Sequence, residues 1–380
     1  MRQNKIAVYT PWFTQTNYGQ VLQAFALKTH LQKMGYESFI IRLDYQAAMR
    51  EAKKNERFSN FFNFSAWCRL FKRVFTPKTE LKAEEMETNI PNRHFDEFRN
   101  SNLYFSDDIF YTIKSLKRNP PKADVYITGS DQVWLVKFLN EASFLNFGNS
   151  DTKRIAYAAS FGRTRPTDKK ESRQIARLIR NFNRVGVRES SAIDIFSKLN
   201  YMQVELVPDP VLLLNKTEWL EIATSTNVLS VERTNVFSYI IARDNTATIY
   251  NIIDFLYPNE NVIYTHADGC GERNNANPTI GEWIDLISKS DFIITNSFHC
   301  SVFCLLFNKE FITISRKNAM STRLVSILEL VGLLDRLVDK FDEKKLSNIK
   351  QRSIDWEDVN AKIELFKKTG VTFLERSLKF

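Results

Sequence analysis

Apolar and polar positions alternate along the chain with two periods, and their order indicates a parallel α/β fold. A short apolar run at 5–10 is followed by a polar loop, and apolar residues then recur every three or four positions as far as Gly35. This spacing predicts a helix that ends at Gly35. The next apolar run, at 38–43, predicts a second strand. A strand, a loop, a helix and a strand in this order are typical of the start of a parallel sheet.

The same rhythm returns twice, on the two sides of a stretch that contains two prolines. Apolar runs predict further strands at 123–129, 153–162, 184–189, 235–242, 260–267, 291–296 and 310–315. Pro208 and Pro210 predict an extended crossing that a helix cannot enter. We therefore expect two α/β domains facing across a cleft, at 1–205 and 206–380. The pattern at 355–380 predicts an amphipathic helix that is able to pack back on the first domain.

Residues 46–115 interrupt this rhythm and predict a basic helical insertion in the N-terminal domain. The net charge of the chain is +9, and eight Lys or Arg against three Glu fall between Gln46 and Glu80. Basic and aromatic composition suits a helix at an anionic membrane surface, so we expect either peripheral membrane contact through residues 58–78 or a helix packed on its own domain. No nucleic-acid motif accompanies the basic block, and we expect no nucleic-acid partner. The apolar positions of the expected helix share one face: Phe64, Trp67, Phe71 and Val74.

Composition limits the class of protein and the kinds of site. A chain of 380 residues with 43% apolar and 26% charged residues is typical of a soluble protein with two cores. The first residues lack the apolar region of a signal peptide, and no apolar run approaches the roughly 18–20 residues of a membrane span. We expect a cytoplasmic protein, able to lie on the inner face of the cytoplasmic membrane. The four cysteines form no CxxC pair, and no standard zinc spacing occurs, so we predict no metal site.

Polar residues follow the predicted strands, at the end of a parallel sheet where ligands bind. After the first strand comes "TQTNYGQ", with Asn17, Tyr18 and Gly19. A single glycine is not a dinucleotide fingerprint, but it allows backbone amides to approach an anion; a plain loop with a helix cap is the alternative. After the strand at 123–129 comes "GSDQVW", with Ser130, Asp131 and Gln132. Asp131 can act as a base, hold a sugar hydroxyl or simply cap a helix.

The stretch "IITNSFHCSVFCLLF" places His299 just behind a predicted strand end, in a chain with only 4 histidines. Asn296 or Ser297 is expected to cap the following helix, so that His299 falls in its first turn. Free backbone N–H groups and the positive helix end favour an anion there. A bound phosphate would favour the protonated imidazole, which a general acid requires. The alternative is a core histidine whose hydrogen bonds are satisfied.

Basic residues at three further places in the chain are candidates for binding an anion. Arg188 follows the strand at 184–189, where its two parallel N–H donors suit a carboxylate or phosphate. Arg316 and Lys317 follow the strand at 310–315, and Arg323 lies in the first turn of the next helix. The alternatives are an exposed Arg188–Glu189 pair and a solvated helix start.

These motifs, in this order, resemble the polysaccharide pyruvyl transferase family over nearly the whole chain. The resemblance rests on "NYGQVLQAFALKTHLQKMGY", "YITGSDQVW", "RIAYAASFG", "VGVRE", "VPDPVLLL", "DFIITNSFHCSVFCLLFNKEF" and "MSTRL". It implies a fold similar to the GT-B glycosyltransferases, with two Rossmann-like domains. It also implies a reaction in which phosphoenolpyruvate gives its pyruvyl unit to two hydroxyls of a sugar, forming a cyclic ketal and releasing phosphate, without a cofactor. The sugar belongs to a bacterial capsule, exopolysaccharide or cell-wall polymer, or to a polyprenyl-linked precursor.

The resemblance also implies roles for the candidate residues. His299 matches the motif histidine and is the expected acid. Asp131 is the second catalytic candidate, for contact with the acceptor or activation of its hydroxyl. Arg188, Arg323 and either Arg316 or Lys317 are the expected donor clamp, with Ser297 beside them. The remaining candidates are expected to contact or activate the acceptor: Asn17, Tyr18, Gly19, Ser130 and Gln132.

Two other functions fit the same pattern. A GT-B glycosyltransferase that uses a nucleotide sugar would bind the nucleotide at "HADGCGERNN", residues 266–275. A non-catalytic glycan-binding component of an assembly complex would not need His299. No G-x-S-x-G elbow or P-loop occurs, which argues against a hydrolase or an NTPase of those kinds.

Overall fold

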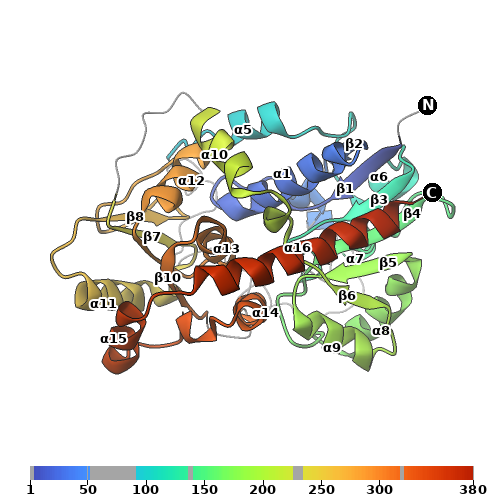
Figure 1. Cartoon of the computed structure of the whole chain (residues 1–380). Helices are drawn as coiled ribbons and strands as arrows, with labels where there is room; N and C mark the ends of the chain where they lie inside the picture. Colours follow the sequence, from blue (N-terminus) through green and yellow to red (C-terminus); the bar gives the residue numbers. More distant parts are fainter. Residues whose placement is uncertain are drawn as a thin grey trace.

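Two parallel β-sheets organise the protein (Figure 1), whose computed structural model describes residues 4–48, 50–51, 91–135, 140–225, 234–316 and 321–379. The first sheet has the strand order β2-β1-β3-β4-β5-β6 and the second the order β11-β10-β9-β7-β8. The strands of the first sheet are β1 (Lys5–Tyr9), β2 (Glu37–Ile40), β3 (Val125–Thr128), β4 (Lys153–Ala159), β5 (Arg184–Val187) and β6 (Val204–Leu206). Those of the second are β7 (Val236–Ile240), β8 (Val262–His266), β9 (Phe292–Thr295), β10 (Glu310–Ile314) and β11 (Leu337–Val338).

Helices cover both faces of each sheet, as parallel strands require. In β1, Ile6 and Val8 pack on Leu27 of α1, whereas Ala7 and Tyr9 pack on the opposite side, where Phe196 of α9 lies. The helices are α1 (Tyr18–Lys33), α5 (Phe95–Asn102), α6 (Ile113–Arg118), α7 (Asn140–Ser143), α8 (Lys169–Leu178), α9 (Ser190–Lys198), α10 (Lys216–Ser225), α11 (Thr246–Leu256), α12 (Ile280–Lys289), α13 (Phe298–Phe307), α14 (Thr322–Val331), α15 (Glu343–Gln351) and α16 (Trp356–Leu378).

The two halves repeat one topology. In each half, the first strand lies between the second and the third: β1 between β2 and β3, and β7 between β8 and β9. The strand order therefore reverses between β1 and β3 and again between β7 and β9, and ligands of such sheets bind at these points. The loops after β1, β3 and β9 carry three of the polar motifs expected to form the site.

The halves share an apolar core around α1. Tyr18, Val21 and Phe25 of α1 belong to the same buried cluster as Trp283 of α12 and Phe303 of α13. This packing holds the start of α1 against the start of α13, and thereby joins two of the strand-end loops.

The crossing at 207–214 corrects one expectation. It was expected to exclude a helix, but Pro210–Leu213 form a short 3-10 helix that begins behind Asp209. Proline fits the first position of a helix because its missing N–H is not needed there. The Asp209 side chain caps this turn by accepting from the backbone N–H of Val211 at 3.0 Å.

The last helix, α16, runs along both halves (Figure 1). Its first part, with Val359 and Ile363, packs in the core that α13 and α14 share. Its last part, with Phe373 and Leu374, packs under β1 and β3. At Gly370 the helix passes so close to the crossing that an added Cβ would lie 2.6 Å from Pro208 and from the Tyr157 hydroxyl. The two connections between the halves therefore touch each other.

The insertion is described in part. Within 46–115 the structure shows α5 and α6, and single bridges join Ile40 to Phe105 and Leu43 to Phe110. The expected membrane-binding segment, 58–78, lies outside the described residues. In the described part of the chain no helix combines the length and the apolar character needed to cross a membrane.

Packing of α16 can be tested with two leucines of the same helix. Leu374→Ala is expected to lower the free energy of unfolding by about 3 kcal/mol, because the side chain is fully buried. Leu365→Ala, at a position that is 67% exposed, is the matched control and is expected to change it by less than about 0.5 kcal/mol. Urea unfolding followed by circular dichroism measures both. Equal losses in the two variants would contradict the observed packing.

Candidate functional site

The site lies where loops from both halves meet around His299. Six of the twelve candidates named from the sequence come together here, each at the end of a strand or in the first turn of a helix. They are Gly19 of α1, Ser130 and Asp131 after β3, Arg188 after β5, His299 of α13 and Arg323 of α14. A further residue, Asp209 of the crossing, joins them.

His299 is buried in the first turn of α13. Ser297 caps this helix by accepting from the backbone N–H of Cys300 at 3.4 Å. On one side, the imidazole touches the backbone of Gly19, where any added Cβ would overlap the ring. On the other side, its Nε2 lies 3.5 Å from the Asp209 carboxylate and 3.5 Å from the Arg188 guanidinium. The imidazole therefore lies between a helix start of the first half and an ion pair.

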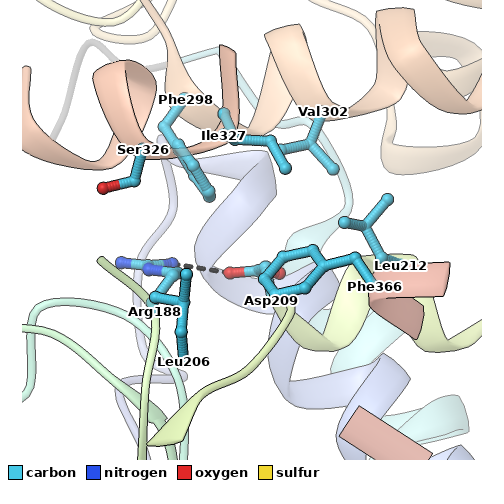
Figure 2. A pocket seen from close by; sticks show the side chains of 9 residues that line it. All are labelled: Arg188, Leu206, Asp209, Leu212, Phe298, Val302, Ser326, Ile327 and Phe366. Atoms are coloured by element: carbon cyan, nitrogen blue, oxygen red, sulfur yellow. Dashed lines mark hydrogen bonds and ion pairs between the residues drawn. The ribbon is translucent and has the colours of Figure 1, made fainter. Parts of the chain in front are cut away.

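Arg188 forms the centre of the polar network (Figure 2). Its Nη1 donates to the Asp209 carboxylate at 2.6 Å and to the Ser130 hydroxyl at 3.1 Å, and its Nη2 lies 3.4 Å from Asp131. The guanidinium also lies over the Phe298 ring, 4.8 Å from its centre. Figure 2 shows Arg188 and Asp209 on one side of a narrow crevice, facing Phe298 and its neighbours on α13 and α14. The expected exposed pair with Glu189 is wrong, because both side chains are buried.

Asp209 joins this network although it was not a candidate from the sequence. Its carboxylate accepts from the Ser130 hydroxyl at 2.8 Å as well as from Arg188. Burial raises the pKa of Asp209, but the His299 and Arg188 charges and the hydrogen bonds outweigh it and hold the pKa well below its usual range. The motif "VPDPVLLL" contains this acid, but its two prolines predict an extended crossing and give no role to the aspartate between them.

Asp131, in the loop after β3, contacts both the cations and the start of α1. Its backbone is left-handed, with φ of 76°, which few residues other than glycine adopt without cost. Its carboxylate accepts from the Gln20 amide at 3.4 Å and lies 3.8 Å from the Arg323 guanidinium. Burial raises its pKa, yet the charges of Arg188, His299 and Arg323 lower it overall, so the carboxylate stays ionised.

Arg316 and Arg323 are paired less closely than Arg188, because the carboxylates that reach them lie nearly 4 Å away. Burial first, and the charge of Arg188 second, lower the pKa of Arg323 to about 10. The nearest carboxylate to Arg316 is that of Asp244 at 3.9 Å. The Nε atoms of Arg188, Arg316 and Arg323 are buried without a hydrogen-bond partner among the described residues. Buried donors in this state are usually met by a ligand or by water.

The side chains of the remaining candidates make no hydrogen bond to the network around His299 among the described residues, or lie outside those residues. Tyr18 points away from His299: its hydroxyl donates to the Pro278 carbonyl at 2.5 Å, and its ring stacks on Trp283. Asn17 caps α1 by accepting from the Gln20 N–H at 3.3 Å. The Gln132 amide nitrogen is buried without a partner among the described residues. Lys317 lies outside the described residues, so the choice between it and Arg316 stays open.

The loop at 266–275 is held by the protein's own arginines. Arg93 donates to the carbonyls of His266 at 2.7 Å and Ala267 at 2.9 Å, and Arg243 pairs with Asp268 at 2.5 Å. The His266 ring lies 3.0 Å from the Tyr250 hydroxyl. Across the described ranges, no three His, Cys, Asp or Glu side chains group as a metal site.

The family model of polysaccharide pyruvyl transferases matches residues 17–318, which hold every site residue above except Arg323. The chain belongs to the polysaccharide pyruvyl transferase family. It is therefore a transferase by family. A comparison with curated protein sequences finds no significant match.

Solved structures with the same fold come from enzymes of other families. The UDP-N-acetylglucosamine 2-epimerase from Rickettsia bellii is 10% identical, with a TM-score of 0.50 over 99% of this chain and 97% of that chain. The UDP-GlcNAc 2-epimerase from Neisseria meningitidis is also 10% identical, with a TM-score of 0.50 over 98% and 99%. The N-terminal domain of trehalose-6-phosphate phosphatase from Candida albicans reaches 0.51 at 11% identity, over 100% and 97%. The expectation of a GT-B fold with two Rossmann-like domains is confirmed.

The buried ion pair of this pyruvyl transferase family member can be tested by pH. The depressed pKa of Asp209 means that its stabilisation is present above the usual Asp value of about 3.9 and is lost as the pH falls below it. Asp209→Asn is expected to cost about 3–5 kcal/mol at pH 7, because it leaves Arg188 buried without its main partner. The variant is also expected to lose less stability than the wild type between pH 5 and pH 3, on the order of 1 kcal/mol or more.

Asp254→Asn is the matched control for this test, since Asp254 is paired with Arg273 at 2.6 Å on the surface. We expect it to cost no more than about 1 kcal/mol. Urea unfolding at several pH values measures both variants. If Asp209→Asn behaved like the surface control, the ion pair would not stabilise the fold.

Proposed function

We propose that this protein transfers the pyruvyl unit of phosphoenolpyruvate onto two hydroxyls of a sugar, in a surface polysaccharide or its lipid-linked precursor. The observation that supports this most is the placement of His299, buried at a helix start and within 3.5 Å of both Arg188 and Asp209. Family membership supplies the reaction class, and the donor and the ketal product are the proposed part.

The charge of the site suits a small, densely anionic donor. Phosphoenolpyruvate carries a phosphate and a carboxylate, and Arg188, Arg316 and Arg323 offer planar donors that match both groups. Their unpartnered Nε atoms leave part of this donor capacity unused. A bound dianion would also relieve the repulsion between Arg188 and Arg323, which contributes to the lowered pKa of Arg323. Donor binding is thus expected to be largely electrostatic.

His299 has the position of a general acid. Protonation of C3 of the enol makes C2 electrophilic, and a sugar hydroxyl then adds to C2. The Asp209 carboxylate lies 3.5 Å from Nε2, so that it can orient the imidazole for this step. Phosphate then leaves with the C2–O bond electrons, and the second hydroxyl closes the ring while its proton passes to the departing phosphate. The arginines stabilise the charge on the departing phosphate.

Asp131 has the position of the residue that receives the acceptor. It lies on the side of the site formed by α1 and β3, where Gln20 donates to it. Because the neighbouring cations keep it ionised, it can accept a proton from the attacking hydroxyl.

The reaction is tested by phosphate release from phosphoenolpyruvate with a panel of galactose, mannose, glucose and N-acetylhexosamine acceptors, free and lipid-linked. The wild type is expected to release phosphate only with its acceptor and to give a product heavier by one pyruvate ketal. His299→Gln is expected to lower kcat by about 100-fold or more, since it removes the acid but keeps the shape. His266→Gln, a buried histidine in the other loop, is the matched control. Equal activity of the wild type and His299→Gln would show that His299 is not the acid.

Donor binding is tested separately by calorimetry. Arg323→Lys is expected to weaken phosphoenolpyruvate binding by about 10-fold or more, because the lysine cannot make two parallel hydrogen bonds. Arg273→Lys, in the surface pair with Asp254, is the control and is expected to leave binding unchanged. Absence of phosphoenolpyruvate binding, together with saturable binding of a nucleotide sugar, would replace this proposal by the glycosyltransferase alternative.

A further inference from the structure

Two segments of the first half, 113–122 and 163–184, carry a large share of the positive charge of the chain. The first contains four Lys or Arg and no acid, and the second contains eight Lys or Arg and two acids. Their net charges of +4 and +6 together exceed the +9 of the whole chain. The segments include the helices α6 and α8, both in the first half (Figure 1). A local excess of this size indicates an anionic partner or a strongly solvated face.

The cations of α8 lie on one exposed face of that helix. Lys170, Arg173 and Arg177 are all exposed and recur at the three- and four-residue spacing that brings side chains to one side. Arg180, also exposed, continues the series in the 3-10 turn that follows. Ile175 lies on the opposite side, buried in the core of the first half. Because the apolar side of α8 is already packed, a partner can reach this helix only through its charged side.

Few carboxylates lie close enough to offset these cations. Glu171, the acid in the first turn of α8, is buried and pairs with Arg163 at 2.6 Å. Glu141 of α7 pairs with Lys117 of α6 and with Arg177 of α8, each at 2.7 Å. One carboxylate therefore joins the two basic helices, and their cations form one continuous surface.

We call the exposed cations of these two helices the basic surface. They are Lys114, Lys117 and Arg118 of α6 and Lys170, Arg173 and Arg177 of α8. Glu141 pairs with two of them, and no carboxylate among the described residues forms an ion pair with the other four. The basic surface thus keeps most of its charge available to a partner.

Exposed apolar side chains accompany both helices of the basic surface. Ile109 and Tyr111, which are 42% and 55% exposed, come just before α6. Met202, which is 75% exposed, precedes β6; this strand pairs with β5, so Met202 stands at the same end of the sheet as Arg184. Tyrosine and other apolar side chains beside cations suit the boundary between lipid head groups and acyl chains. A soluble polyanion such as a nucleic acid offers no comparable apolar layer, so these residues favour a membrane as the partner.

We propose that the basic surface binds the anionic head groups of a phospholipid membrane and holds the first half of the protein against it. The cations attract the lipid phosphates, and Tyr111 and Met202 contact the apolar layer beneath the head groups. Leu116 of α6 and Leu178 of α8 stay packed in the core, so neither helix has to insert. The inference goes beyond the proposed function, because it depends neither on the donor nor on the sugar. It also differs from the expected contact at 58–78, which lies outside the described residues.

The first test is cosedimentation of the full chain with phosphatidylcholine vesicles, with and without about 30% phosphatidylglycerol. We expect the wild type to bind only the anionic vesicles and to be released by about 0.5 M NaCl, which screens the charges. Neutralising four unpaired cations of the basic surface is expected to weaken binding about tenfold or more. The combined variant is Lys114→Gln, Arg118→Gln, Lys170→Gln and Arg173→Gln.

The matched control removes the same charge from four exposed lysines of the second half and of α16. It combines Lys216→Gln, Lys340→Gln, Lys344→Gln and Lys368→Gln. We expect it to weaken vesicle binding less than about threefold, because these lysines lie outside the basic surface. Both variants are expected to keep the melting temperature of the wild type, since only exposed side chains change. Absence of binding to anionic vesicles, or equal binding by the two variants, overturns the proposal.

The second test separates a membrane from a soluble polyanion. Tyr111→Ser with Met202→Ser is expected to weaken vesicle binding roughly three- to tenfold and to leave binding of a short DNA duplex unchanged. Leu365→Ser, at a position of α16 that is 67% exposed, is the control and is expected to bind vesicles as the wild type does. Tighter binding of the duplex than of the vesicles, or no effect of the double variant on the vesicles, would make the surface a general polyanion site and overturn the proposal.

Calorimetry with phosphoenolpyruvate distinguishes this inference from the proposed function. The variants of the basic surface are expected to bind the donor as the wild type does, because none of the changed residues belongs to the site around His299. Vesicle binding that depends on the basic surface, in a protein that does not bind phosphoenolpyruvate, would keep the membrane contact and remove the proposed donor. Donor binding without vesicle binding would keep the donor and overturn the membrane contact.

Discussion

The buried ion pair between Arg188 and Asp209 holds the site together. The two side chains bring the end of β5 to the crossing between the halves at 2.6 Å, with both charges almost removed from water. Such a pair is costly to bury and is stable only when further hydrogen bonds satisfy its remaining donors and acceptors. Ser130 and the Val211 N–H supply these bonds to Asp209. The positions of His299 and Asp131 depend on the same guanidinium.

The arginines around this pair differ in how closely a carboxylate reaches them. Arg188 pairs with Asp209 at 2.6 Å, whereas the carboxylates that reach Arg316 and Arg323 lie nearly 4 Å away. Burial and then the charge of Arg188 lower the pKa of Arg323, and a bound anion would relieve this repulsion between the two arginines. This is the condition in which a binding site is ready for its ligand before the ligand arrives.

Much of the fold and part of the site could be predicted from the sequence, since local patterns record them. The strands after which Asp131, Arg188 and His299 stand are continuous apolar runs, and parallel sheets bring such strand ends together. Asp209 could not be predicted in the same way, because its partners are contributed by segments far away in the sequence. The sequence places Tyr18 in a polar loop, but its ring stacks on Trp283 of the other half, which the local pattern does not record.

The contact between α16 and the crossing decides how the halves can move relative to each other. Two domains joined by one connection can rotate about any axis through it. With two connections, the easiest rotation is about the line that passes through both. Pro208 and Gly370 place both connections together, with Tyr157 beside them. A rotation of one half relative to the other is therefore expected about an axis through this contact, and it would have to break the packing of α1 on α12 and α13.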